Sequence, residues 1–274
     1  MGKTKLLFIT HEMSPFLELT KISEITRQLP QAMQEKGYEI RILMPRFGSI
    51  NERRNRLHEV IRLSGMNIII NEDDNPLIIK VASIPAARMQ VYFLDNEDYF
   101  QRKYAFHDIK NKFYKDNDER AIFFCKGALE TVKKLGWAPD VVHCHGWMSA
   151  LIPAYLKTNY KDDPTFKESK VVYSVYENSF NESLGADFAT KANMKGMNAI
   201  DTELYTAGTN LALDLAAISF ADAVVIGDDK VSDEVLNFVK KQDKPTLAFE
   251  STLDLENYNN FYQEIASEEL VSLA

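Results

Sequence analysis

Two histidines separated by one residue end an apolar run. His143 and His145 close the segment Val-Val-His-Cys-His at residues 141–145. Successive side chains of a β-strand point to opposite faces, so both imidazoles would lie on one face, a spacing that suits zinc ligands. The sequence marks no third ligand, and histidines hydrogen-bonded at the end of a strand are the interpretation we favour. We therefore predict neither a metal site nor a cofactor here.

A second polar segment follows the first apolar run of the chain. Leu6 to Ile9 is unbroken by polar residues, and His11 to Phe16 is a polar turn. An apolar run without alternation is typical of a central parallel strand that is covered on both faces. In doubly wound folds the turn after such a strand faces the ligand crevice. We expect the binding site between His11 and Ser23.

Alternating strands and helices are predicted to position these residues. Helical spacing of apolar residues predicts helices over residues 22–33 and 117–135, ended by Gly37 and Gly136. Asp116 and Asn117 are expected to cap the second of these helices, and residues 227–229 to cap a later one. Further strands are expected at 38–45, up to 145, 170–176, 220–226 and 247–249, and further helices from about 147, over 210–220, after 229 and over 258–270. This order predicts an α/β fold with a doubly wound, Rossmann-like parallel sheet.

Several short runs of β character interrupt the alternation. They cover residues 59–63, 67–71, 77–83 and 89–94, with a turn predicted at 71–76. Successive strands without an intervening helix predict an antiparallel hairpin insertion at the edge of the main sheet.

A polar and aromatic loop follows, from Asp95 to Lys112. Its rings belong to Tyr99, Phe100, Tyr104, Phe106 and His107. Aromatic faces pack on pyranose rings, so the loop could bind sugar, and rings beneath a long loop could also serve packing alone. We favour packing.

Bulk properties restrict the class of protein. The 274 residues are 45% hydrophobic and carry a net charge of -8, with no basic cluster to attract nucleic acid or an anionic membrane. Cys125 and Cys144 lie in apolar segments, which predicts unpaired core thiols in a reducing compartment. The sequence shows neither a signal segment nor a membrane span, so a cytoplasmic location is expected.

The segment from Glu12 to Pro30 resembles the opening of bacterial glycogen synthases and plant starch synthases, glycosyltransferase family 5. That family has a Glu-x-x-Pro-Phe turn and a helix with Leu-Pro, matched here by Glu12, Pro15, Phe16, Leu29 and Pro30. Further matches are Pro45-Arg46-Phe47, Tyr114 with Asn117 and Arg120, Asp140 to Trp147, and Pro153 to Lys157. The resemblance covers about the first 250 residues. It implies one N-terminal lobe of a GT-B glycosyltransferase (1–250), followed by a helical tail (251–274).

The resemblance also implies which residues bind substrate. His143, His145, Trp147, Tyr114, Asn117 and Arg120 occupy family motif positions and are the predicted substrate-binding residues. Three features on the donor side depart from the family. The family's Lys-Thr-Gly-Gly loop reads Glu18-Leu19-Thr20-Lys21, its motif aspartate is Gly146, and its sugar-contacting histidine is Tyr176. Glu18 repels a diphosphate, while side chains on Thr20 and Lys21 block the close backbone approach that glycine permits.

Several functions follow as expectations. The family transfers glucose from ADP-glucose to an α-1,4-glucan and uses a second lobe that these 274 residues have no room to encode. The sequence predicts a glycogen or starch synthase-like domain that is inactive or incomplete alone, with catalysis completed by a separate C-terminal-domain chain. A non-catalytic glucan-binding or regulatory relative, a pseudoenzyme, is the alternative, and an unrelated binding role on the same scaffold is a third. An α-glucan or a nucleotide sugar is the expected ligand.

Overall fold

A single mixed sheet organises the computed structural model, which describes residues 2–84, 87, 89–194, 197–250 and 253–267. Within these residues the sheet has ten strands in the order β10-β9-β8-β7-β1-β2-β6-β5-β3, with β4 paired to β5 alone. The strands are β1 (Lys5–Thr10), β2 (Glu39–Pro45), β3 (His58–Glu59), β4 (Met66–Ile70), β5 (Asp73–Ile84), β6 (Met89–Asp95), β7 (Val141–His145), β8 (Lys170–Val175), β9 (Ala223–Ile226) and β10 (Thr246–Leu247). The pairs from β10 to β6 are all parallel.

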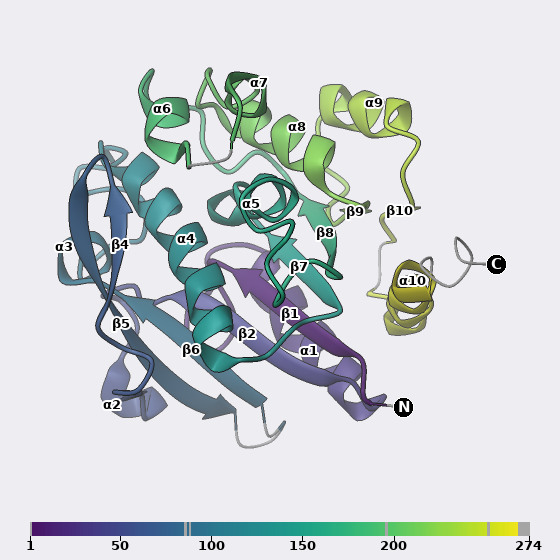
Figure 1. Ribbon diagram of the computed structural model, residues 1–274, viewed down its shortest axis with the longest axis horizontal. Helices are drawn as coiled ribbons and strands as arrows, with labels where there is room; N and C mark the ends of the chain where they lie inside the picture. The colour runs from purple at the N-terminus through teal and green to yellow at the C-terminus, as the bar shows by residue number, and fades with distance from the viewer. Residues whose placement is uncertain (1, 85–86, 88, 195–196, 251–252, 268–274) are drawn as a thin grey trace.

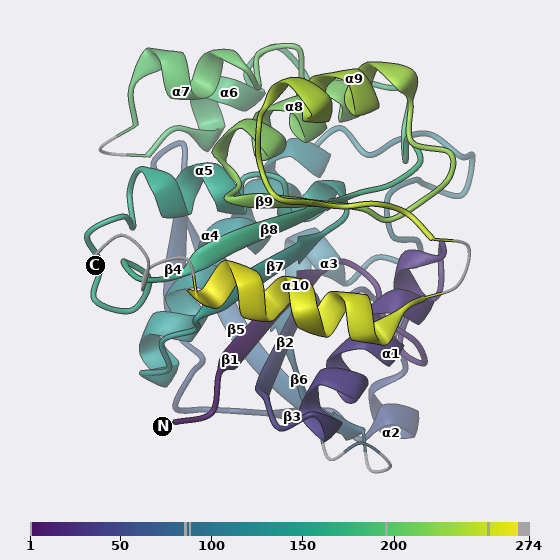
Figure 2. The ribbon, with the colours of Figure 1, turned by 90° about the vertical axis from the view of Figure 1, so that its right-hand side faces the viewer.

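Helices cover both faces of this sheet (Figures 1 and 2). On one face lie α4 (Asn117–Leu135), the 3-10 helix η1 (Trp147–Ser149), α5 (Ile152–Lys157) and α8 (Asn210–Phe220), while α1 (Ile22–Glu35) and α10 (Leu255–Ser267) cover the other. The shorter helices are α2 (Glu52–Asn55), α3 (Glu97–Phe100), α6 (Phe188–Ala192), α7 (Ala199–Glu203) and α9 (Asp233–Lys241). The predicted doubly wound α/β fold is confirmed.

The central strand is buried because both faces are covered. Leu6 to Ile9 are fully buried, and β1 pairs in parallel with β2 on one side and β7 on the other. Parallel strands of this kind need apolar residues on both faces, which explains the unbroken run. The carboxyl ends of β1, β7, β8 and β9 therefore meet at one edge of the sheet, where doubly wound folds place their ligands.

The predicted hairpin insertion forms the opposite end of the sheet. β5 pairs antiparallel with β6, β3 and β4. Two local predictions were wrong in extent. The turn between β4 and β5 occupies only Asn71 and Glu72, both with positive φ, and residues 60–63 form a turn after a strand of two residues.

Other predicted boundaries also need correction. Residues 220–222 end α8 and precede β9, instead of starting the strand. Ser232, not the segment 227–229, caps α9 by accepting from the Val235 amide. Asp116 makes no capping bond to α4 because its carboxylate binds Arg102. The terminal helix begins at Leu255, and residues 268–270 of the predicted span lie outside the described part of the chain.

Two further sequence expectations concern thiols and membranes. Cys125 and Cys144 are buried and unpaired. Among the residues that the structure describes, no helix has the length and apolarity to cross a bilayer.

Candidate functional site

An imidazole occupies the space beside Gly146 at the carboxyl edge of the sheet. A Cβ atom at Gly146 would lie 2.1 Å from Cε1 of His11, and the residue's φ of +76° favours glycine. His11 is 1% exposed, and its Nδ1 has no hydrogen-bond partner among the described residues. An aspartate at position 146 therefore cannot be accommodated while His11 keeps this position.

A tyrosine ring fills the corresponding space beside Gly227. A Cβ atom at this glycine would lie 2.4 Å from Cε1 of Tyr176. The hydroxyl of Tyr176 lies 2.7 Å from Nδ1 of His145, while Nε2 of that histidine has no described partner. Burial, with the nearby His11, lowers the pKa of His145 to about 3, so its imidazole is neutral at neutral pH.

The neighbouring histidine is enclosed by hydrogen bonds. Nδ1 of His143 lies 2.6 Å from the hydroxyl of Tyr262 on α10, and its Nε2 lies 2.7 Å from Oγ of Ser174 on β8. Burial, with His145, lowers its pKa well below the ordinary value. The two imidazole rings are 4.0 Å apart, on one face of β7 as the strand period predicts.

The two histidines of β7 have a spacing that suits zinc ligands. In the described part of the chain, no group of three or more His, Cys, Asp or Glu side chains is arranged to hold a metal ion. His143 has hydrogen-bond partners on both ring nitrogens, which leaves it no lone pair for a ligand bond.

The loop after β1 is closed on a buried carboxylate. Glu12 is fully buried and accepts hydrogen bonds from the Leu19 amide at 2.7 Å, the Thr20 amide at 2.8 Å and the Thr20 hydroxyl at 2.6 Å. Burial alone would raise the pKa of Glu12, but the hydrogen bond and charge of His11, with the bonds from Thr20, hold it below the ordinary value. The amides of Leu19 and Thr20, which an anion could otherwise occupy, are thus already bound to the protein's own carboxylate.

The cation of this loop is also engaged. Nζ of Lys21 lies 3.2 Å from carboxylate oxygens of both Asp228 and Asp229, which follow β9. The bonds to Asp229 and Asp228 raise the pKa of Lys21. Ser14 donates to Glu18 at 2.6 Å within the same loop. The loop is therefore joined to the end of β9, and carboxylates surround its lysine.

The predicted substrate-binding residues of α4 lie in the interior. Asn117 and Arg120 are fully buried and donate to the carbonyls of Phe106, at 2.9 Å, and Tyr99, at 2.7 Å. Tyr114 is half-buried, and the Arg120 guanidinium lies 5.3 Å from its ring centroid. These contacts fix the loop before α4, and none of the three residues lines either cavity described below. Their role in substrate binding stays a prediction.

A cavity of about 440 Å³ lies between that loop and the turn after β1. Rings gather around it: Trp147 is buried and packs 5.1 Å from Phe106, which in turn lies 5.4 Å from His11. The full lining comprises His11, Leu19, Thr20, Tyr104, Ala105, Phe106, His107, Asp108, Ile109, Asn111 and Ser179. Tyr99 and Phe100 are buried away from it, as the packing interpretation predicts, whereas Tyr104, Phe106 and His107 face it.

Sequence reasoning did not single out several residues of this edge. The sequence places His11 at the start of the expected binding segment, but only the glycine at position 146 indicates that the imidazole packs against that residue. Ser174 and Tyr262 could not be found because their contact with His143 depends on the packing of α10 against the sheet.

Comparisons with known proteins decide the family. A sequence profile described as "Starch synthase catalytic domain" matches residues 5–244, most of the chain. The chain belongs to the starch synthase catalytic domain family. Its residues 5–244 contain β1 to α9, so this domain accounts for nearly the whole sheet.

Individual relatives agree with this assignment. The chain is 36% identical to a glycogen synthase from Chlorobium limicola over 234 residues, 85% of this chain and 47% of the relative. A glycogen synthase from Chlorobaculum tepidum is 36% identical over 251 residues, 89% of this chain and 49% of the relative. The chain spans about half the length of the curated relatives it matches.

A solved structure shares the fold. The catalytic domain of starch synthase IV from Arabidopsis thaliana, bound to ADP and acarbose, superposes with a TM-score of 0.74. Sequence identity is 15%, and the match covers 94% of this chain and 53% of the other. The fold is thus that of a GT-B starch synthase lobe.

Proposed function

We propose that these residues form a glycogen or starch synthase-like glycosyltransferase lobe that binds α-glucan but does not by itself transfer glucose from a nucleotide sugar. The observation that carries the proposal is the closure of the loop after β1. Its amides donate to Glu12, and Lys21 is held by Asp228 and Asp229. Retaining glucosyl transfer depends on stabilising the departing diphosphate, and the Leu19 and Thr20 amides and the Lys21 ammonium of this loop are already bound to the protein's own carboxylates.

The local charge supports the same proposal. Glu12, Glu18, Asp228 and Asp229 lie around a single loop lysine. A diphosphate placed among them would meet more negative than positive charge, and the cost of this repulsion rises as the site is desolvated.

The cavity beside the loop before α4 supports the glucan-binding part. It combines exposed and half-buried rings with carboxylate, amide and hydroxyl groups, among them Tyr104, His107, Asp108 and Asn111. Aromatic faces pack on the C–H face of a pyranose, while the polar groups bind its hydroxyls. Its volume of about 440 Å³ lies within the range of small-ligand sites.

Glucose incorporation into glycogen from ADP-[14C]glucose tests the transfer part. We expect no incorporation above a heat-treated sample of the same protein. Turnover by the purified 274-residue chain would contradict the proposal.

Affinity electrophoresis in glycogen-containing gels tests the glucan part. We expect retardation of the wild-type protein, and less retardation of Tyr104→Ala because that substitution removes a ring from the cavity. Ile61→Ala, which alters an exposed side chain elsewhere on the hairpin insertion, is the matched control and should migrate like the wild type. Unchanged mobility of the wild type in glycogen would refute glucan binding.

A second candidate is suggested by the coverage of the relatives, because the chain matches about half of each. In that case a separate chain supplies the other lobe, and catalysis occurs only in the complex. Adding a purified partner lobe to the incorporation assay distinguishes the two candidates. Incorporation that requires both chains supports the complex, and its absence favours the non-transferring lobe.

A further inference from the structure

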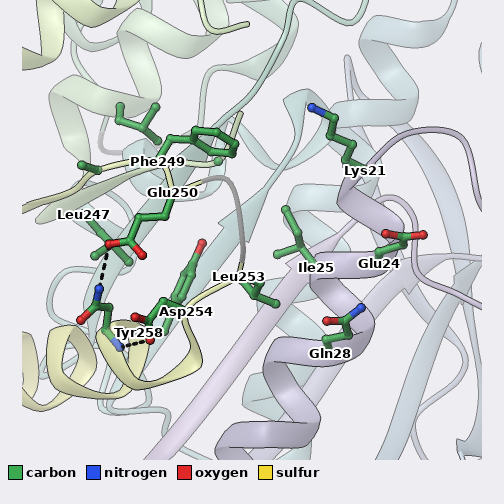
Figure 3. A pocket seen from close by; sticks show the side chains of 14 residues that line it. Lys21, Glu24, Ile25, Gln28, Leu247, Phe249, Glu250, Leu253, Asp254 and Tyr258 are labelled. Atoms are coloured by element: carbon green, nitrogen blue, oxygen red, sulfur yellow. Dashed lines mark hydrogen bonds between the residues drawn. The ribbon is translucent and has the colours of Figure 1, made fainter. Parts of the chain in front are cut away.

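A second cavity, of about 330 Å³, lies between α1, α10 and the segment after β10 (Figure 3). It is separate from the cavity proposed to bind glucan, and the inference drawn from it does not depend on that proposal. The lining consists of Lys21, Glu24, Ile25, Gln28, Ile226, Gly227, Leu247, Ala248, Phe249, Glu250, Leu253, Asp254, Asn257 and Tyr258. Most of its inner wall is aliphatic or aromatic.

The hydroxyl of a largely buried tyrosine opens into this cavity. Tyr258 is 7% exposed, and its hydroxyl forms no hydrogen bond with the residues that the structure describes. Figure 3 shows its ring rising from α10 toward the space between Phe249 and Ile25. Burial raises its pKa, so the hydroxyl is a neutral group at physiological pH. A hydroxyl that has no partner among the described residues and opens into the cavity can donate to a ligand that accepts its proton.

The charges around the cavity exclude anions. Glu24, Glu250 and Asp254 contribute carboxylates to the lining, and Lys21 is its only Lys or Arg. This lysine is already paired with two aspartates. A phosphate in or near the cavity would therefore meet net negative charge.

The scarcity of free polar groups restricts neutral ligands as well. The lining has two side-chain amides, Gln28 and Asn257. Asn257 donates to Glu250 at 2.9 Å, whereas the Gln28 amide has no hydrogen bond within the described residues. A pyranose carries hydroxyls around its ring, and several of them would face Ile226, Leu247 or Leu253 unpaired. A flat ring with two apolar faces and a few polar atoms at its edge matches the lining better.

We propose that this cavity binds an uncharged planar heteroaromatic ring of the nucleobase kind. The Tyr258 hydroxyl donates to a ring nitrogen or carbonyl at the edge of the base, and the Gln28 amide pairs with a second edge atom. Ile25, Phe249 and Leu253 pack against the ring. The ring could come from a free nucleoside or from a nucleotide, and the carboxylates of the lining favour the nucleoside.

Isothermal titration calorimetry on the whole chain tests this proposal with adenosine, uridine, AMP, ADP and maltotriose as separate probes. We expect saturable binding of at least one nucleoside at one site, with affinity falling from adenosine to AMP to ADP because each phosphate adds negative charge. Tyr258→Phe should weaken nucleoside binding about fivefold to tenfold through loss of one hydrogen bond. Tyr104→Phe, in the other cavity, is the matched control and should leave nucleoside affinity unchanged.

Several results would overturn the proposal. They are the absence of saturation by either nucleoside at millimolar concentration, tighter binding of ADP than of adenosine, or nucleoside binding that Tyr258→Phe does not alter. Displacement of nucleoside by maltotriose would also overturn it, because it would assign the cavity to sugar. Since the Tyr258 hydroxyl has no hydrogen-bond partner among the described residues, the variant should fold normally, and its melting temperature checks this.

Discussion

At the scale of single residues, two glycines determine which rings can occupy the carboxyl edge of the sheet. Gly146 leaves room for His11, and Gly227 leaves room for Tyr176. The three donor-side differences in the sequence are therefore linked in space to a fourth residue, His11. A side chain at Gly146 would require His11 to move, and a side chain at Gly227 would require Tyr176 to move.

The contact at Gly227 gives a testable stability difference. Gly227→Ala places a methyl group 2.4 Å from Tyr176 and should destabilise the fold by about 1–3 kcal/mol, the usual cost of overpacking a core. Urea unfolding measures the free energy. In a Tyr176→Ser background the same substitution should cost less, because the ring that it meets is gone. Equal costs in both backgrounds would show that the two positions are not coupled.

Buried titrating residues predict how stability depends on pH. His143 and His145 stay neutral in the folded state well below 6.5, whereas in the unfolded chain they bind protons near pH 6.5. Their contribution to stability is therefore lost as the pH falls below about 6.5. Burial raises the pKa of Asp214 to about 7, so this carboxyl acts in the opposite sense between about pH 7 and 4. Two histidines outnumber one carboxyl, so the three groups together take up protons on unfolding below about pH 6.5, and stability falls as the pH drops.

Two substitutions separate these contributions. Asp214→Asn removes the offset, so stability should fall more steeply with acid, while His145→Gln should flatten the dependence. Unfolding free energies between pH 7.5 and 4.5 give the slopes. Identical slopes for both variants and the wild type would show that these groups do not titrate as described.

At the scale of elements, hydrogen bonds of Tyr262 and Asn259 hold α10 against the sheet. The hydroxyl of Tyr262 lies 2.6 Å from His143, and Tyr38 donates to Asn259 at 3.0 Å. Tyr262→Phe leaves a fully buried imidazole nitrogen without a partner and should cost about 1–3 kcal/mol in urea unfolding. Tyr258→Phe, one helical turn earlier, removes a hydroxyl that bonds to no residue in the described part of the chain, and is the matched control with little expected change. Similar costs for both would indicate that the histidine contact contributes nothing specific.

Elements with strong local patterns were predictable from sequence. The helix over 117–135 and the buried helix over 210–220 have the predicted bounds, and the unbroken apolar runs identified the parallel strands. Helix caps and element ends were predicted less accurately. Asp116 binds Arg102, 14 residues earlier, and Asp228 binds Lys21, 207 residues earlier. Local composition does not reveal such partners.

At the scale of the whole molecule, the architecture gathers the loop after β1 and the ends of β7, β8 and β9 at one edge. The family motifs predicted the doubly wound sheet that brings these ends together, and the functional effect of the departures at Glu18, Thr20 and Lys21 stays a prediction. They could not predict that Lys21 pairs with Asp228 and Asp229, because these residues are more than 200 positions apart and meet only through the order of the strands.

This edge predicts the response of the molecule to nucleotide sugars. ADP-glucose should not raise the melting temperature, because the loop amides and lysine are already engaged with carboxylates. Thermal unfolding with increasing ADP-glucose measures this. A saturable upward shift, retained in Tyr258→Phe so that the second cavity is not its cause, would show that the loop after β1 opens to admit a diphosphate.

The bonds from Leu19 and Thr20 to Glu12 carry a consequence for local motion. Leu19 is 46% exposed, yet its amide donates to the carboxylate of Glu12, which is fully buried. The amide proton of this surface residue should exchange with deuterium on the slow timescale of the interior, since exchange requires that its hydrogen bond to the buried Glu12 carboxylate first open. A stretch that looks peripheral by accessibility should thus behave kinetically as part of the core.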